Sequence, residues 1–412
     1  MTRALVLVGF LFAGVAGAEE LPVVDAGQPE PLPVDAGSSQ MFEIDAGPPA
    51  SMAALPPEPA PVPSEPSALS TFLAQTSLGG YGELTYNRAG SETPIVDLRR
   101  IVLFVGHTFG EHWRFYSEIE WEHAVTSFDD QGEAEIEQAY LDYLHADAFN
   151  VRAGLILMPV GIINLEHEPP TFNGVDRPLV DTLIIPSTWR EPGFGIWGRL
   201  GEDLRYQAYV VDGFRATGFT HETIREGHQE AQLALARSGG GVARLTYVPW
   251  NPLQLGVSGY LASANQGELP AGQGKLSLGE ADAQLQWHGV EARAELAFSH
   301  ITGTQYLATD PPIGSTQYGL YAEAGYDVWR LLHTGGTASA IAYGRYQRVD
   351  TNYRVAAGLQ PDDAAETQVF EGGLSWLPIP NIVFKGDVRY FDHPLVDGQN
   401  QLWIDLGIGW MY

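Results

Sequence analysis

Short segments in which apolar and polar side chains alternate follow one another from about Leu78 to the C-terminus. A period of two places apolar side chains on one face of a β-strand and polar side chains on the other. Each segment has about ten residues, which is enough for a tilted strand to cross a bilayer. The last segment is the clearest, and one of its faces carries Leu402, Ile404, Leu406, Ile408, Trp410 and Tyr412.

About 16 such segments can be assigned, and an even number brings both ends of a closed antiparallel sheet to the same side of a membrane. The predicted strands are 78–87, 96–106, 112–123, 134–144, 148–158, 193–200, 203–213, 241–249, 252–263, 279–288, 290–301, 316–330, 337–350, 366–377, 381–393 and 401–412. Short and long connections alternate between them, as periplasmic turns and external loops do in outer-membrane barrels. The sequence therefore predicts an all-β fold, a transmembrane antiparallel β-barrel.

The N-terminus has the features of an export signal. Arg3 is followed by an apolar run from Ala4 to Val15, and Ala16-Gly17-Ala18 supplies small residues for cleavage. The apolar run is too short to span a bilayer, and no later run reaches the roughly 18 apolar residues that a membrane helix needs. We expect residues 1–18 to be a signal peptide.

Residues 19–70 are rich in proline, alanine and acidic residues, contain no Lys, Arg or His, and repeat Asp-Ala-Gly from Asp25, Asp35 and Asp45. Prolines lack the N–H of a helix or central strand, and too few large apolar groups are present to form a core. The repeats also lack the dense oxygen ligands of a calcium loop. We expect a disordered periplasmic linker here and the barrel domain at 71–412.

Composition excludes several classes of function. The chain has no cysteine, so disulfides and thiolate metal sites are excluded. Its formal net charge of −29 argues against a nucleic-acid partner. A large soluble β-protein would share the alternating pattern, but outward faces this apolar would aggregate without lipid. Outer-membrane lipid is therefore the expected surrounding.

The longest predicted connection, 159–192, is the third external loop when the N-terminus lies in the periplasm. It carries many large apolar residues, among them Ile162, Phe172 and Trp189. Such groups need a surface to pack on, and the inside wall of the barrel supplies one. We expect the loop to fold inward and form the pore constriction, where its charges would set selectivity. The charged residues of this loop are Glu166, His167, Glu168, Asp176, Arg177, Asp181, Arg190 and Glu191.

Polar faces of the predicted strands supply cations opposite this loop. An acidic loop facing a cationic wall creates a transverse field that orients dipolar solutes. The alternative is that these cations pair with neighbouring lumen carboxylates and only stabilise the barrel, and alternation leaves open whether Arg99 or Arg100 faces inward. The expected lumen cations are Arg99, Arg114, Arg152, Arg205, Arg244, Arg293, Lys385 and Arg389.

Motifs for chemistry are weak. The adjacent residues Glu166, His167 and Glu168 point in different directions, and no second histidine stands at helical spacing, so this run predicts no metal site. Neither a nucleophile elbow nor a phosphate-binding glycine loop ahead of a helix is present. We expect no catalytic residue, no metal and no cofactor.

Several runs resemble the phosphate-selective porin family of the outer-membrane porin O/P type. They are SLGGYGELTYN (Ser77 to Asn87), LRRIVLFVGHTF (Leu98 to Phe109), WRFYSEIEWEHA (Trp113 to Ala124), EIEQAYLDY (Glu135 to Tyr143), RAGLILMPVGIINLEHEPPTFNGVDRP (Arg152 to Pro178) and IIPSTWREPGFGIWG (Ile184 to Gly198). The resemblance implies a homotrimeric outer-membrane porin with a cation-lined anion pore. It also implies that Trp410 and Tyr412 form the signal read by the barrel-assembly machinery. The sequence departs from the family in its acidic barrel, whose only lysines are Lys275 and Lys385.

The sequence thus predicts a porin for passive diffusion of small hydrophilic solutes or ions, including anions such as phosphate, through a constriction formed by 159–192. Three alternatives stay open: a sugar-preferring channel, an outer-membrane enzyme, and a structural barrel with a plugged lumen. The sugar alternative depends on tyrosines expected to face the lumen, namely Tyr81, Tyr116, Tyr140, Tyr209, Tyr260 and Tyr321.

Overall fold

The structure is a computed structural model that describes residues 68–127, 132–307, 309–332, 335–392 and 400–412. The expected signal peptide and residues 19–67 of the expected linker lie outside the described residues. Helix α1 (Ala68–Ala74) spans the expected start of the barrel domain and leads directly into the first strand. Among the described residues, no helix has the length and apolar character needed to cross a bilayer.

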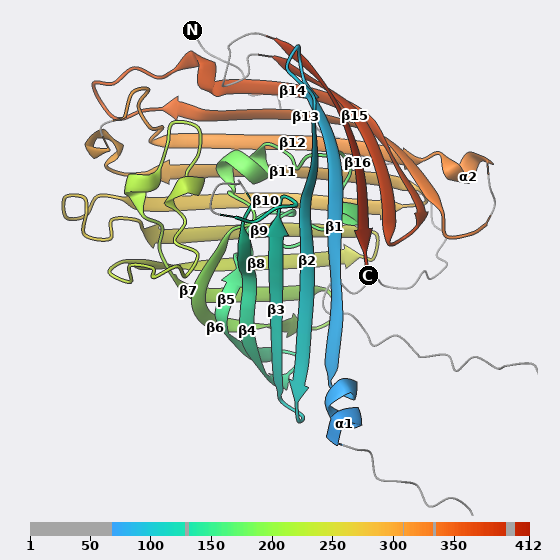
Figure 1. Ribbon diagram of the computed structural model, residues 1–412. Helices are drawn as coiled ribbons and strands as arrows, with labels where there is room; N and C mark the ends of the chain where they lie inside the picture. Colours follow the sequence, from blue (N-terminus) through green and yellow to red (C-terminus); the bar gives the residue numbers. More distant parts are fainter. Residues whose placement is uncertain (1–67, 128–131, 308, 333–334, 393–399) are drawn as a thin grey trace, which may run out of the picture. The chain divides into compact units, whose positions relative to one another are not determined.

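Sixteen antiparallel strands form one closed barrel in which each strand pairs with its neighbours in the sequence and β1 pairs with β16 (Figure 1). This confirms the predicted fold class. The strands are β1 (Thr76–Ala89), β2 (Ile95–Phe109), β3 (Trp113–Glu122), β4 (Ala134–Ala146), β5 (Phe149–Leu157), β6 (Arg190–Leu200), β7 (Leu204–Asp212), β8 (Gly239–Trp250), β9 (Leu253–Ser263), β10 (Lys275–Trp287), β11 (Val290–Ile301), β12 (Thr316–Asp327), β13 (Ser339–Arg354), β14 (Glu366–Ile379), β15 (Ile382–Asp392) and β16 (Gln401–Met411).

The two faces of each strand differ as the alternation predicts. On β16, Leu402 and Leu406 point outward and are about half exposed, whereas Asp405 points inward and is fully buried. Apolar side chains therefore cover the outside of the barrel and polar side chains line the inside, which is the arrangement of a barrel in lipid.

One strand boundary differs from the prediction in a way that affects the site. Strand β6 begins at Arg190, because Arg190 and Glu191 pair with Leu157 and Ile156 of β5. Pro192 does not end the strand, since the pairing of β6 with β7 begins only at Gly193 and a residue without an N–H is tolerated there. Arg190 and Glu191, predicted as loop residues, are therefore wall residues.

The two ends of the barrel differ in the length of the connections that they carry. One end carries mostly short turns, at 110–112, 147–148, 201–203, 251–252, 288–289 and 380–381, together with 328–338, which contains α2 (Trp329–Leu332). We call it the turn end. The other, the loop end, carries the long connections that include the 3-10 helices Ala216–Gly218, Arg225–Gly227, Thr304–Tyr306 and Asp363–Ala365. The longest connection is 158–189, which we call the constriction loop.

Candidate functional site

The constriction loop lies inside the barrel. Its 3-10 helix, Pro169–Thr171, contacts β1, β15 and β16, and its single π-helical turn, Val180–Ile184, contacts β11, β12 and β13. These strands stand across the lumen from β5 and β6, where the loop begins and ends. The loop, green in Figure 1, therefore crosses the lumen and narrows it, as its apolar content predicts.

Apolar packing holds one end of the loop. Trp189, Val180 and Ile184 are fully buried. The ring of Trp189 packs edge-on against Tyr260 of β9, with ring centroids 4.6 Å apart, and lies 5.1 Å from the ring of Phe214 in the next long loop. Burial of these side chains in the lumen explains why the segment is too apolar for a solvated loop.

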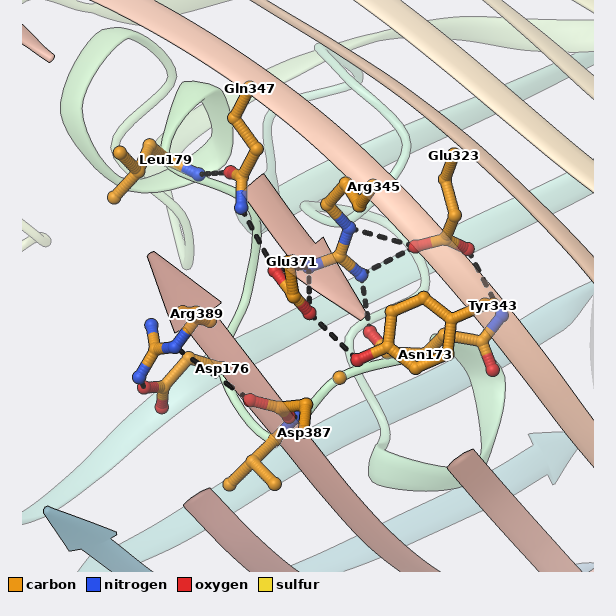
Figure 2. A network of polar contacts seen from close by, with 12 residues as sticks. Asn173, Asp176, Leu179, Glu323, Tyr343, Arg345, Gln347, Glu371, Asp387 and Arg389 are labelled. Carbon is orange, nitrogen blue, oxygen red and sulfur yellow. Dashed lines mark hydrogen bonds and ion pairs between the residues drawn. The ribbon is translucent and has the colours of Figure 1, made fainter. Parts of the chain in front are cut away.

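A guanidinium at the centre of the wall holds the middle of the loop (Figure 2). Arg345 of β13 lies between two carboxylates, with N–O distances of 2.6 Å to Glu323 of β12 and 3.0 Å to Glu371 of β14. Its Nη2 also donates to the carbonyl oxygen of Asn173. One buried side chain thus joins three strands to the loop.

Polar groups of the wall also satisfy the backbone of the loop. The N–H of Val175 donates to Asp387 Oδ2 at 2.7 Å, and Lys385 Nζ donates to the carbonyl of Gly174 at 2.8 Å. Gly174 has a φ of +83°, and a Cβ there would lie 2.6 Å from Glu371 Oε1, so only glycine fits. Buried backbone groups need such partners, and the lumen wall supplies them in place of water.

Asp176 joins the loop to two strands at once. Its Oδ1 lies 2.7 Å from Arg99 Nη1, and its Oδ2 pairs with Arg389, which also binds Asp405 at 2.8 Å. Burial alone would raise the pKa of Asp176, but the charges of Arg389 and Arg99 lower that pKa to about 2. The carboxylate therefore stays ionised and paired in ordinary conditions.

The other charged loop residues have different surroundings. His167 is buried against Glu118 and Glu137, which, against the opposing effect of burial, raise the pKa of its imidazole to about 10. Burial, with the nearby charge of Glu280, raises the pKa of Asp181 to about 8. Glu166 and Glu168 are partly buried, and burial raises the pKa of Glu166.

Arg177 is also partly exposed, and burial lowers the pKa of its guanidinium. Among the described residues, no carboxylate is within ion-pair distance of Arg177. Arg190, now on β6, pairs with Glu135 at 2.5 Å, and Glu191 accepts a hydrogen bond from the indole N–H of Trp189 at 3.1 Å. The predicted loop charges thus fall into three groups: internal ion pairs, buried carboxyls without a cation partner among the described residues (Asp181 and Glu191), and the partly exposed Glu166, Glu168 and Arg177.

All the cations predicted for the wall lie on the lumen side, but half of them are neutralised there. Arg152 pairs with Asp142 at 2.8 Å, and Arg244 pairs with Asp282 at 2.5 Å and Glu280 at 3.1 Å. Arg99 and Arg389 share Asp176. Among the described residues, the predicted wall cations without a carboxylate within ion-pair distance are Arg114, Arg205, Arg293 and Lys385.

Two cations outside the predicted set, Arg100, whose facing the alternation left open, and Arg345, are central to the site. Arg100 pairs with Glu83 at 3.0 Å and Glu120 at 3.1 Å. A bulge in the pairing of β1 with β2 leaves Arg99 without a partner residue, so that Arg99 and Arg100 both reach inward. Arg345 could have been found from the sequence, because it alternates with the same period as Tyr343 and Gln347.

Most of the tyrosines expected to face the lumen are buried. Tyr81 and Tyr260 are fully buried, Tyr321 and Tyr209 are almost so, and Tyr140 is 9% exposed with Arg152 over its ring. A sugar ring needs an exposed aromatic face, and among the six only Tyr116 is partly exposed.

The C-terminal residues close the barrel. Trp410 pairs with Gly82 of β1, and Tyr412 exchanges two backbone hydrogen bonds with Gly80, at 2.9 and 2.8 Å. These contacts join the last strand to the first. The role of the two aromatic residues as an assembly signal stays a prediction.

Comparison with known proteins gives one family and one fold. A family model described as phosphate-selective porin O and P matches residues 76–215. An uncharacterized protein of Aquifex aeolicus (strain VF5) is 32% identical over 353 residues, which are 82% of this chain and 80% of that protein.

Solved structures of outer-membrane proteins share the fold at low identity. OmpF of Salmonella typhi, in complex with daunomycin, has a TM-score of 0.58 at 11% identity, covering 82% of this chain and 97% of that one. The outer membrane channel DcaP of Acinetobacter baumannii has a TM-score of 0.54 at 11% identity, with the same coverage. The trimer form of in-vitro folded OmpT of Vibrio cholerae has a TM-score of 0.51 at 9% identity, covering 82% and 99%.

Proposed function

Because the chain belongs to the phosphate-selective porin O and P family and is an outer-membrane porin, we propose that its channel favours small cations and neutral polar solutes over phosphate. The family is one of porins, and this supports a channel. The constriction loop sets the narrowest part of the path, and its charges decide which solutes pass.

The observation that carries this proposal is the pairing of the constriction arginines. Arg345 is bound by Glu323 and Glu371, Arg244 by Glu280 and Asp282, and Arg389 by Asp176 and Asp405. A guanidinium recognises phosphate through its planar fork, and these forks are already bound to carboxylates. The arginines therefore anchor the loop and are not free to form a binding path for anions.

Two wall cations that lack carboxylate partners at the constriction, Lys385 and Arg293, are also engaged. Lys385 donates to the carbonyl of Gly174, and its Nζ lies 3.6 Å from the centre of the Phe172 ring. Arg293 donates to the carbonyl of Thr171 at 2.5 Å. In the described part of the chain, Glu166 and Glu168 are partly exposed on the same loop and outnumber its one unpaired, partly exposed cation, Arg177, so we expect the accessible charge at this level to be negative.

One observation favours anions as a second candidate. Arg114, Arg152 and Arg205 lie on the lumen face near the turn end and are partly exposed, and Asp142 is the carboxylate bound to one of them. Such a group of cations attracts anions into one mouth of the pore. It lies away from the constriction, so we expect it to affect conductance more than selectivity.

The oligomeric state and the orientation in the membrane are also part of the proposal. We propose that three copies associate, as in the trimer form of OmpT, with outer-membrane lipid around the barrels. Helix α1 enters β1 at the turn end, which supports a periplasmic position for that end and for a linker at 19–70 after removal of a signal peptide at 1–18. Insertion would use the barrel-assembly machinery and the closing residues Trp410 and Tyr412.

Ion selectivity of the purified protein in a planar bilayer tests the proposal. In a potassium chloride gradient, the reversal potential should have the sign of a cation preference, and added phosphate should not block the current. Replacement of the partly exposed loop carboxylates (Glu166→Gln with Glu168→Gln) should move the reversal potential towards anions. Anion preference with block by phosphate would show that the family's anion selectivity applies here. Absence of any conductance would favour a barrel plugged by its loop.

A further inference from the structure

A group of buried ionisable side chains lies where the constriction loop meets β3 and β4. Nε2 of His167 is 3.3 Å from Glu118 Oε1 and 3.6 Å from Glu137 Oε2. The three residues are only 3%, 2% and 0% exposed. Glu137 is the extra residue of a bulge, since Gln138 pairs with Glu118 and Ile136 with Ile119. The bulge turns a second carboxylate towards the histidine.

The separations of these atoms match the geometry of a metal site. Ligands bound tetrahedrally at about 2.0–2.2 Å from zinc lie about 3.4 Å from one another. The contact between His167 and Glu118 is within hydrogen-bond distance at 3.3 Å, but it is longer than the usual distance of about 2.7–2.9 Å between an imidazolium and a carboxylate. The distances from Nε2 to the two oxygens lie on either side of the metal value.

The buried side chains around the histidine carry more negative than positive charge, which favours binding of a cation. Four carboxylates, those of Glu83, Glu118, Glu120 and Glu137, are buried here, and the guanidinium of Arg100 pairs with two of them. Within the described part of the chain, neither oxygen of the fully buried Glu137 has a hydrogen-bond partner. Buried charge without compensation is costly. A divalent ion brings the local net charge closer to zero than one imidazolium does.

We propose that His167, Glu118 and Glu137 bind a divalent transition-metal ion of the zinc class, which fastens the constriction loop to the barrel wall. One imidazole and two carboxylates suit zinc, and manganese is the next candidate. Gln138 Nε2 donates to Glu118 Oε2 at 2.6 Å and leaves Oε1 facing the histidine, as the hydrogen bonds around a metal-binding carboxylate do. The ligands come from two strands and a loop, and not from the neighbours of His167 in the sequence.

The metal content of the full chain tests this. The protein is refolded in detergent with zinc chloride, with manganese chloride or with a chelator, dialysed, and analysed by mass spectrometry for metal per chain. We expect one zinc per chain and a higher midpoint of thermal unfolding with zinc than with the chelator. His167→Gln and Glu137→Gln should lose both effects. The matched control Glu168→Gln, a partly buried carboxylate next to His167 that is not one of the three proposed ligands, should keep them.

Two results would overturn the proposal. Folded wild-type protein that retains neither zinc nor manganese would show that a protonated histidine alone balances the carboxylates. Zinc retained equally by His167→Gln and Glu137→Gln would place the ion elsewhere. If one variant does not fold, judged by its heat-dependent mobility on a gel, the wild-type measurement and Glu118→Gln still decide the question.

Discussion

Arg99 of β2 and Asp176 of the constriction loop lie 2.7 Å apart, and the same carboxylate also binds Arg389 of β15. One loop carboxylate thus pairs with two wall arginines, and Asp405 supplies the second negative charge. The pKa of Asp176, held at about 2 by Arg389 and Arg99 against the effect of burial, shows how strongly they favour its ionised form.

Replacement of Asp176 by asparagine should therefore change selectivity. Asp176→Asn leaves Arg99 without a carboxylate partner and Arg389 with Asp405, so the reversal potential in a salt gradient should move towards anions. Asp147→Asn, at an exposed turn where Asp147 pairs with Arg199, is the control and should leave the reversal potential unchanged. An unchanged potential in Asp176→Asn would mean that these arginines do not face the ion path.

The buried Arg345 should matter more for stability than any exposed arginine. Arg345→Gln leaves Glu323 and Glu371 without their guanidinium, and loss of one partner from a buried ion pair costs about 3–5 kcal/mol. Arg348 lies on the same strand as Arg345 and forms a partly exposed ion pair with Glu366 of β14. Arg348→Gln removes that pair and should cost about 1 kcal/mol or less. Urea-induced unfolding in detergent measures both. Equal losses would show that the central network is not fully formed.

Asp181 should make stability depend on pH. Burial, with the charge of Glu280, raises its pKa from 3.8 to about 8. The folded protein then binds the proton more tightly than the unfolded chain does, so stability falls as pH rises from about 4 to about 8 and is constant above. Asp181→Asn should be increasingly more stable than wild type over this range. Unfolding midpoints measured across the range test this, and the exposed turn variant Glu202→Gln should show no such trend.

Trp189 should control how firmly the loop is held. Trp189→Ala leaves a cavity between Tyr260 and Phe214, at a cost of about 3–5 kcal/mol. Single-channel recordings should show a larger and noisier current, because a looser loop blocks less of the lumen. Trp250→Ala, which removes a half-exposed indole on the outside of the barrel, should leave the current as it is. A quiet current in Trp189→Ala would mean that the polar contacts suffice to hold the loop.

Much of the architecture could be predicted from alternation, because the inner and outer faces of each strand have opposite polarity. The number of strands, the closed barrel and the inward position of the wall cations all follow from it. The bulges do not, since an extra residue breaks the period locally. Arg99 and Arg100 therefore both face inward, and Glu137 joins His167, where a regular pattern places them differently.

The partners of each charge could not be predicted either. Alternation assigns a face to Arg389 or Lys385 but says nothing about which loop atom lies opposite. Those contacts depend on the path of the constriction loop across the lumen, and that path is set by the three-dimensional packing of Trp189, Val180 and their neighbours. Only the general outcome could be predicted, because pairing of the wall cations with lumen carboxylates was one of the two alternatives that the alternation left open.

The origin of the loop's partners has a consequence for the order of folding. The N–H of Val175 is held by Asp387, 212 residues later, and that of Leu179 by Gln347, 168 residues later. Contacts this distant in sequence form late, because a long stretch of chain must first be brought together. The loop can settle only once the last strands are in place. A chain that lacks the C-terminal strands would leave this apolar segment uncovered and prone to aggregation. We therefore expect such a chain to be degraded by proteases and not to form a leaky channel.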